Sequence, residues 1–331
     1  MTTKCYTPAT GYVLEELDDF LQSLKLEYDN GITYTIIKWD DDGIAATGSL
    51  DGRVLKCVAV RPDLRGTTLL QEVVKELIEE VHAQGHEHVL LVTRPIHEER
   101  FQDMGFYTVE ETDRLLLMED RPDGLNEWLE TVPAAGDGIK GVIIANFDPI
   151  TNGHMYLIQK AQLLCDKLYL FVLSDERGAI PAQDRLEMVK AAVAHIPNVI
   201  VCPAGDYQVS NATFPAYSLP DREAINRLSC ELDLKLFACK IAAPLGISHR
   251  FVGQEPYSPL TGKYNLYMKE ILPQYGVSLV EFSRLRANDK GFFNSFAVRR
   301  LWDEKDFEAL AELVPHSTLE YMKNHRPVAT R

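Results

Sequence analysis

Two different patterns of apolar and polar residues divide the chain. After about residue 140, short apolar runs of strand length alternate with longer segments in which apolar residues recur at helical spacing. This alternation predicts a parallel, doubly wound α/β sheet whose strands are connected by helices. We expect strands near 141–145, 168–173, 198–202, 234–238, 249–252 and 277–282, and helices near 154–166, 184–195, 221–232, 262–272, 295–302 and the C-terminus.

The front of the chain follows a different order, in which several strands surround a few helices. An amphipathic acidic segment predicts a helix over 12–24, and the polar run 40–43 predicts a hairpin turn. Proline, glycine and small residues near 130–139 mark a boundary, so we expect domains at 1–136 and 137–331. The other elements expected here are strands over 31–38, 44–50, 54–60 and 88–93 and helices over 69–82 and about 97–104.

In the first domain the runs 58–66 and 101–106 flank a long predicted helix. These runs and the order of the elements resemble the GNAT superfamily of acetyltransferases. The resemblance implies an α+β fold whose strand-to-helix turn wraps the pyrophosphate of acetyl-CoA with glycines. Here only Gly66 is a glycine, and the Cβ atoms of Thr67 to Leu70 would obstruct a close backbone approach. We therefore weigh two alternatives, a scaffold without a ligand and a groove that holds pantetheine.

The second domain opens with a strand, a polar turn and a helix. Residues 141–145 are apolar, Asp148-Pro149 and Asn152-Gly153 are turn formers, and helical spacing follows His154. The free N–H groups of a helix start at the carboxyl edge of a sheet attract anions such as phosphate. His154 would add a donor to the same anion. The alternative is an ordinary turn in which His154 only caps the helix.

Residues 147–154 resemble the signature of the nucleotidyltransferase superfamily, T/H-x-G-H after F-x-P. In that superfamily the motif holds the phosphates of ATP or CTP and supports attack on the α-phosphate. The resemblance implies a Rossmann-like domain in which His154 is catalytic. It also implies nucleotide contacts from Asn146, Phe147, Asp148, Thr151, Gly153 and His154.

A later strand carries further candidates for nucleotide binding. Gly253 permits a close backbone approach, and Glu255 is a candidate acceptor for ribose hydroxyls or an exocyclic amine. Arg250 is either a phosphate clamp or a surface residue of the strand.

The segment before the C-terminal helices supplies positive charge. The superfamily places I-S-x-S/T-x-x-R here, with hydroxyls and an arginine on the β- and γ-phosphates. In this chain Ser295 and Arg299 are present, whereas Asn294 and Phe296 replace the expected hydroxyl residues. We expect Ser295 and Arg299 to bind the nucleotide, and Lys290 and Arg299 to act in catalysis.

The second domain contains four longer motifs, F-D-P-I-T-N-G-H at 147–154, Y-Q-V-S-N-A-T-F-P-A-Y at 207–217, R-F-V-G-Q-E-P-Y-S-P-L-T-G-K-Y-N at 250–265 and K-G-F-F-N-S-F-A-V-R at 290–299. Together with the GNAT-like front, these motifs resemble the citrate lyase ligases over almost the whole chain. The resemblance implies that acetate and ATP form acetyl-adenylate, with Mg²⁺ bridging the phosphates and no protein metal site. The acetyl group would then pass to the thiol prosthetic group on the acyl carrier subunit of citrate lyase.

Two other functions remain open at this point. One is an adenylyltransferase that joins AMP to a phosphorylated small molecule. The other is a non-catalytic protein that binds the carrier through the front domain.

Composition and charge exclude some classes of partner and indicate the cellular compartment. A formal net charge of -15 argues against a nucleic-acid surface, and no apolar run is long enough to span a membrane. The N-terminus lacks the pattern of a secretory signal, and the six cysteines form no C-x-x-C pair. We expect a cytoplasmic protein with reduced thiols, in which a cysteine nucleophile is a minor alternative.

Overall fold

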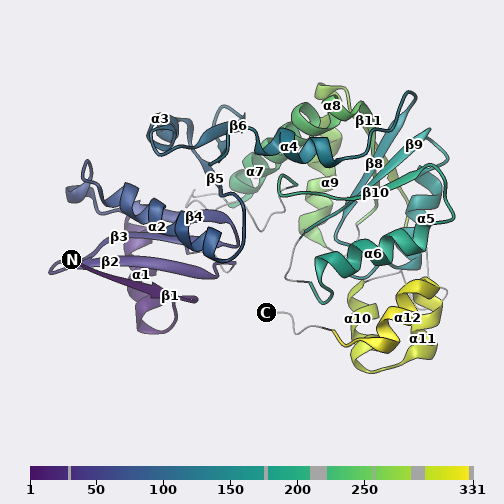
Figure 1. Ribbon diagram of the computed structural model, residues 1–331, viewed down its shortest axis with the longest axis horizontal. Helices are drawn as coiled ribbons and strands as arrows, with labels where there is room; N and C mark the ends of the chain where they lie inside the picture. The colour runs from purple at the N-terminus through teal and green to yellow at the C-terminus, as the bar shows by residue number, and fades with distance from the viewer. Residues whose placement is uncertain (29–30, 175–177, 209–221, 256–257, 285–294, 328–331) are drawn as a thin grey trace. The chain divides into compact units, whose positions relative to one another are not determined.

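The computed structural model describes the chain except residues 29–30, 175–177, 209–221, 256–257, 285–294 and 328–331 (Figure 1). Its contacts divide the chain into two compact units, which we describe separately. Unit 1 comprises Met1–Glu127 and Val209–Leu236, and unit 2 comprises Trp128–Gln208 and Phe237–Arg331. The described residues 222–236 therefore belong to unit 1, whereas the expected boundary near residue 136, which stays a prediction, assigns them to the second domain.

Unit 1 is built on a seven-stranded sheet in the order β1-β2-β3-β4-β5-β7-β6. Neighbouring strands pair antiparallel except β4 and β5, which run parallel. The strands are β1 Thr2–Tyr6, β2 Tyr34–Asp40, β3 Gly43–Asp51, β4 Val54–Val60, β5 Leu90–Thr93, β6 Tyr107–Glu111 and β7 Leu116–Glu119. The helices are α1 Tyr12–Ser23, α2 Leu69–Ala83, α3 Glu98–Gln102 and α7 Arg222–Leu236, with single turns η1 Pro62–Leu64 and η2 Pro95–His97.

Apolar residues on both faces of this sheet are buried by helices. Ile36 belongs to the cluster formed with Leu77 of α2, whereas the next residue, Ile37, packs with Leu17 of α1. Because successive side chains of a strand point to opposite faces, α1 and α2 cover opposite faces of the sheet. At Gly48 of β3 an added Cβ would lie 2.7 Å from Leu77, so α2 approaches this strand closely.

Unit 2 is built on a five-stranded parallel sheet in the order β10-β9-β8-β11-β12. The strands are β8 Lys140–Ala145, β9 Lys167–Val172, β10 Val199–Pro203, β11 Ile247–Gly253 and β12 Ser278–Phe282. The helices are α5 Asn152–Ala161, α6 Ala182–Val193, α8 Ala243–Leu245, α9 Pro259–Ile271, α10 Ser295–Asp303, α11 Phe307–Leu313 and α12 His316–Asn324, with turns η3 Phe237–Ala242 and η4 Leu272–Tyr275. Helix α4, Gly124–Thr131, spans the division between the units.

The core of unit 2 joins the sheet to the C-terminal helices. Val298 and Trp302 of α10, Leu310 of α11 and Met322 of α12 belong to one buried cluster with Ile143 of β8. Helices α10, α11 and α12 lie together at the yellow end of the chain (Figure 1). This packing fixes the N-terminal end of α10 relative to the sheet, which matters for Arg299.

The expected fold class is confirmed in its architecture, since an α+β unit with a mostly antiparallel sheet precedes a doubly wound parallel sheet. The strand expected at 234–238 is wrong, because these residues complete α7 and begin the π-helical turn η3. The sequence alternates apolar and polar residues over 232–236, yet no glycine or proline separates it from the preceding helical segment. The helix therefore continues, and Leu234 and Leu236 are fully buried in it.

Candidate active site

The strand order creates a topological switch point beside β8. The chain proceeds from β8 to β9 and β10 on one side, and then returns to β11 and β12 on the other side. In a parallel sheet the carboxyl ends share one edge, and ligands bind in the crevice at the switch point. The turn after β8 and the segments after β11 and β12 therefore face the same crevice.

Reciprocal hydrogen bonds between Thr151 and His154 fix the start of α5. The Thr151 hydroxyl accepts from the His154 backbone N–H at 3.3 Å, and His154 Nδ1 accepts from the Thr151 backbone N–H at 3.1 Å. This capping box satisfies two donors at the helix start. Phe147, which is 1% exposed, supports the imidazole from one side with ring centroids 5.1 Å apart.

The same contacts determine the protonation state of His154. Because Nδ1 accepts a hydrogen bond, the proton of the neutral ring lies on Nε2. Burial lowers the pKa of His154 to about 4, and the charge of Arg284 adds to this effect. At neutral pH the residue is therefore an uncharged Nε2–H donor beside the helix N-terminus, which suits an anionic phosphate oxygen.

Asp148 connects the turn to two other segments of unit 2. Its carboxylate accepts the backbone N–H groups of Ala179 and Ile180 at 2.9 and 3.0 Å. Arg299 of α10 donates to the Asp148 carbonyl oxygen at 2.6 Å and lies 3.4 Å from its carboxylate. These bonds make Asp148 a positioning residue that brings the cation of Arg299 to the turn.

Arg185 of α6 stabilises the turn through hydrogen bonds to main-chain carbonyls. The sequence did not identify this residue as part of the site. Its side chain is fully buried, with Nη1 donating to the carbonyl of Asn146 at 2.7 Å and Nε to that of Ile180 at 3.0 Å. Buried charges need such hydrogen bonds to offset their desolvation. The only sequence signal was an arginine on the apolar face of a predicted helix.

A second group of polar side chains lies beyond β11 and β12. Arg284 forms an ion pair with Glu255 and donates from Nε to the carbonyl of Gln254 at 2.6 Å. Asn265 of α9 donates to the carbonyl of Gly253 at 3.1 Å. Arg284 was missed, although a cation two residues after a predicted parallel strand is placed to face the crevice. The charge of Arg284 lowers the pKa of His154, as expected for two segments that end at the same sheet edge.

Gly253 has open space around its α-carbon. Among the residues that the structure describes, no atom lies within 4 Å of a Cβ added there. These residues therefore do not require a glycine at the end of β11. A ligand that approaches the backbone closely would account for it.

Arg250 lies in the interior of unit 2 at 6% exposure. Its guanidinium carbon is 4.7 Å from the ring centroid of Phe237 and 5.7 Å from that of Tyr264. It stands three residues before the end of β11, which corresponds to about 10 Å of strand. This cation–π setting differs from the phosphate clamp and from the exposed strand position that we considered, and the clamp stays a prediction.

Several expected contacts cannot be placed. Lys290 and Asn294 lie outside the described residues, as does most of the aromatic segment 207–217. Ser295 begins α10 and Gly153 is the second residue of α5, so both stand at helix starts. A contact between these two residues and a nucleotide stays a prediction.

Two of the buried cysteines are held as thiols. Burial raises the pKa of Cys202 and of Cys230 to about 12, so both remain thiols at neutral pH. Within the part of the chain that the structure describes, no group of three or more His, Cys, Asp or Glu side chains could hold a metal ion. Among the same residues, no helix has both the length and the apolar character to cross a bilayer.

The switch-point turn, the helix start and the histidine donor define a nucleotidyltransferase-type domain. A family model of the citrate lyase ligase C-terminal domain matches residues 140–322. Over 320 residues the chain is 35% identical to the citrate (pro-3S)-lyase ligase of Escherichia coli (strain K12), with 94% of this chain and 90% of the relative covered. The corresponding protein of Klebsiella pneumoniae is 32% identical over 316 residues, covering 93% and 92%.

The chain therefore belongs to the citrate lyase ligase family, and it is an enzyme of the ligase class. A shorter similarity connects it to the phosphopantetheine adenylyltransferase of Staphylococcus carnosus (strain TM300). These two chains are 41% identical over 64 residues, which is 19% of this chain and 40% of the relative. Both similarities agree with a ligase-type nucleotidyl transfer.

The low pKa of His154 predicts a pH-dependent stability. An unfolded histidine titrates near 6.5 and the folded one near 4, so the unfolded state binds more protons between these values. The stability that the neutral His154 provides is fully present above about pH 6.5. As the pH falls toward 4, the free energy of unfolding decreases by up to about 3 kcal/mol. Urea unfolding measures this loss. Between pH 6.5 and 4 the free energy of unfolding should fall more steeply for the wild type than for His154→Asn. Parallel pH profiles would contradict the buried neutral histidine.

The open space at Gly253 predicts a selective effect of substitution. Gly253→Ala should leave the melting temperature nearly unchanged and weaken ATP binding, because the new methyl group would meet a bound ligand and none of the described residues. Calorimetric titration with ATP measures the affinity. Gly48→Ala is the matched control, since its Cβ would clash with α2, lowering stability by about 1–3 kcal/mol without touching the nucleotide. An unchanged ATP affinity in Gly253→Ala would contradict a close approach of the nucleotide to the backbone of Gly253.

Proposed function

We propose that the enzyme activates acetate with ATP and transfers the acetyl group to a carrier thiol. In the first step a carboxylate oxygen of acetate attacks the α-phosphate, the bond to the β-phosphate breaks, and acetyl-adenylate and pyrophosphate form. In the second step a thiolate attacks the acyl carbon, AMP leaves with the oxygen that acetate contributed, and a thioester forms. The thiol belongs to the prosthetic group on the acyl carrier subunit of citrate lyase.

The observation that carries the first step is the neutral His154 donor held at the start of α5. Acetate is already an anion, so the step needs no general base and depends on orientation and charge neutralisation. The His154 Nε2–H, the helix N–H groups and the nearby guanidinium of Arg299 would share the phosphate charge. The site supplies preorganised donors, which is the requirement of this reaction.

ATP would bring the divalent cation with it. Mg²⁺ prefers oxygen ligands, retains several waters and bridges phosphate oxygens rather than entering a dedicated protein cage. The described carboxylates fit this arrangement, because Asp148 and Glu255 are both engaged by arginines and backbone N–H groups. The ion would supply charge neutralisation at the triphosphate, while the protein residues orient it.

One specific observation favours a second candidate function. The similarity to phosphopantetheine adenylyltransferases, 41% identity over 64 residues, suggests AMP transfer to a phosphorylated acceptor. That reaction would also release pyrophosphate, although its acceptor would be a phosphate rather than acetate. The two functions therefore differ in the compound that starts pyrophosphate release.

Acetate-dependent exchange of labelled pyrophosphate into ATP tests the first step. The wild type should exchange only when acetate is present, and His154→Ala should reduce the rate by about 10²–10³. His316→Ala is the control, because His316 is an exposed histidine in the same unit. Exchange without acetate would favour the adenylyltransferase function. Near-wild-type exchange in His154→Ala would contradict a role of this residue in the first step.

Arg299 should act on the outer phosphates of the nucleotide. In Arg299→Ala we expect ATP and ADP affinities to fall by about tenfold, with AMP affinity much less affected, because a charge-assisted bond to phosphate is lost. Calorimetry with the three nucleotides measures this difference. The neighbouring Arg300→Ala is a matched control, since Arg300 is 65% exposed. Equal losses for all three nucleotides would place Arg299 away from the β- and γ-phosphates.

A further inference from the structure

Arg250 of β11 carries a positive charge in the interior of unit 2. Its side chain is 6% exposed, and its Nη1 atom is buried without a hydrogen-bond partner among the described residues. Its contacts are aromatic, with the guanidinium carbon 4.7 Å from the ring centroid of Phe237 and 5.7 Å from that of Tyr264. Ring contacts do not replace the hydrogen bonds that a guanidinium loses on leaving water. The buried donor is therefore suited to an anionic ligand.

A carboxylate on the neighbouring strand is already engaged elsewhere. Glu281 of β12 pairs with Val252 of β11, so it lies on the same face of the sheet as Arg250. Its carboxylate accepts from Asn265 at 3.2 Å and forms an ion pair of 2.8 Å with Lys269. This carboxylate therefore serves Lys269 rather than Arg250.

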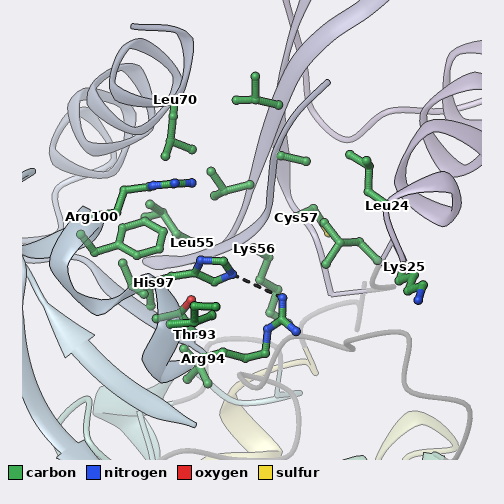
Figure 2. A pocket seen from close by; sticks show the side chains of 18 of the residues that line it. Leu24, Lys25, Leu55, Lys56, Cys57, Leu70, Thr93, Arg94, His97 and Arg100 are labelled. Carbon is green, nitrogen blue, oxygen red and sulfur yellow. Dashed lines mark hydrogen bonds between the residues drawn. The ribbon is translucent and has the colours of Figure 1, made fainter. Parts of the chain in front are cut away.

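Exposed arginines in unit 1 differ from Arg250 in their access to water. Arg94 and Arg100 line a pocket of about 1070 Å³ and are exposed, and Arg94 lies 3.4 Å from the ring of His97 (Figure 2). Water can hydrate these two guanidinium groups, so they need no partner in the protein. Arg250 has little such access, and its unpaired donor lowers the stability unless a ligand accepts from it.

Arg250 points to the face of the sheet opposite the C-terminal helices. The next residue, Phe251, belongs to the buried cluster that contains Ile158 of α5 and Val298 of α10. Successive side chains of a strand point to opposite faces, so Arg250 lies on the other face, where it meets η3 and α9. Arg250 and Arg299 therefore belong to opposite sides of the sheet.

The guanidinium of Arg250 lies toward the carboxyl end of β11, although its backbone is three residues before that end. It packs against Tyr264, and the next residue of α9, Asn265, donates to the carbonyl of Gly253 at 3.1 Å. Gly253 is the last residue of β11. A ligand held by Arg250 would therefore lie beside the crevice at the carboxyl edge of the sheet.

This side of the sheet is the one from which a nucleophile is expected. The attacking and leaving oxygens of a displacement at phosphorus lie roughly in line, so they occupy opposite sides of the phosphorus atom. Arg299, which is expected at the outer phosphates, reaches the turn after β8 from α10. The attacking oxygen would then approach from the opposite face, where Arg250 supplies a buried cation.

We propose that Arg250 binds the carboxylate of acetate and holds it for attack on the α-phosphate. The Nη1–H would donate to one carboxylate oxygen and leave the other oxygen directed at the phosphorus. The rings of Phe237 and Tyr264 would lie beside the methyl group, and one guanidinium between two rings suits a monocarboxylate with a small apolar tail. This assignment rests on the proposed function and deepens it, because it names the residue that selects the carboxylate substrate.

Acetate-dependent pyrophosphate exchange by Arg250→Met tests the assignment. Methionine retains a long unbranched side chain and removes the charge. The KM for acetate should rise about tenfold or more, because a charged hydrogen bond is lost, while the ATP affinity stays at the wild-type value. The melting temperature should stay the same or rise, since an unpaired buried charge is removed. Arg250→Lys, which keeps the charge without the planar fork, should show a smaller rise in KM.

Arg300→Met is the matched control, because Arg300 is an exposed arginine of the same unit, and it should leave both values unchanged. An unchanged KM for acetate in Arg250→Met and a lowered melting temperature would assign Arg250 a purely structural role. A fall in ATP affinity would identify a phosphate clamp. Either result would overturn the proposal.

The aromatic rings should determine the size of the acid that is accepted. Phe237→Leu should raise the ratio of kcat/KM for propionate to that for acetate by about tenfold, because the smaller side chain makes room for one methylene group. Phe171→Leu is the control, since Phe171 is a fully buried ring on another strand of the same sheet, and its ratio should not change. An unchanged ratio in Phe237→Leu would contradict the placement of the acid beside this ring.

Saturation-transfer NMR separates this site from the proposed function, because its signal does not depend on turnover. With the α,β-methylene analogue of ATP bound, saturation of aromatic protons should reach the methyl protons of acetate in the wild type and not in Arg250→Met. Transfer in a wild-type protein that exchanges no pyrophosphate would count against the proposed function alone. Equal transfer in Arg250→Met, or no transfer in a wild-type protein that does exchange, would overturn the assignment to Arg250.

Discussion

The hydrogen bonds between Thr151 and His154 are the constraint on which the candidate active site depends. They start α5 immediately after the switch-point turn, and they leave the imidazole proton on Nε2. Burial keeps the ring neutral, so the donor does not change its state around neutral pH. A helix terminus, a fixed tautomer and a parallel sheet edge thus combine into one candidate site for an anion.

Two arginines from other helices also hold the turn after β8 in place. Arg299 reaches it from α10 through Asp148, and Arg185 supports it from α6 through the carbonyl of Asn146. Since both guanidinium groups bond main-chain carbonyls, the position of the turn is set by the packing of these helices. The charge that would neutralise the leaving pyrophosphate is therefore connected to the core that contains Val298 and Trp302.

Much of this could be predicted from the sequence, because the signals were local. The apolar run 141–145, the turn formers and the helical spacing after His154 predicted a strand, a turn and a helix that the structure contains. The partners of side chains distant in sequence could not be predicted. The carboxylate of Asp148 binds backbone N–H groups about thirty residues away, and no local pattern in the sequence indicates these partners. Arg284 and Arg185 gave no motif, and the alternation over 232–236 did not distinguish a strand from a buried helix.

In the proposed mechanism an oxygen of acetate becomes bonded to the α-phosphorus of ATP. The formation of this bond is tested most directly by supplying [¹⁸O₂]acetate, ATP and the carrier that bears the thiol arm, and by measuring ¹⁸O in the released AMP by mass spectrometry. The mechanism predicts one ¹⁸O atom in each AMP formed together with a thioester. Thioester formation with unlabelled AMP would contradict an acetyl-adenylate intermediate.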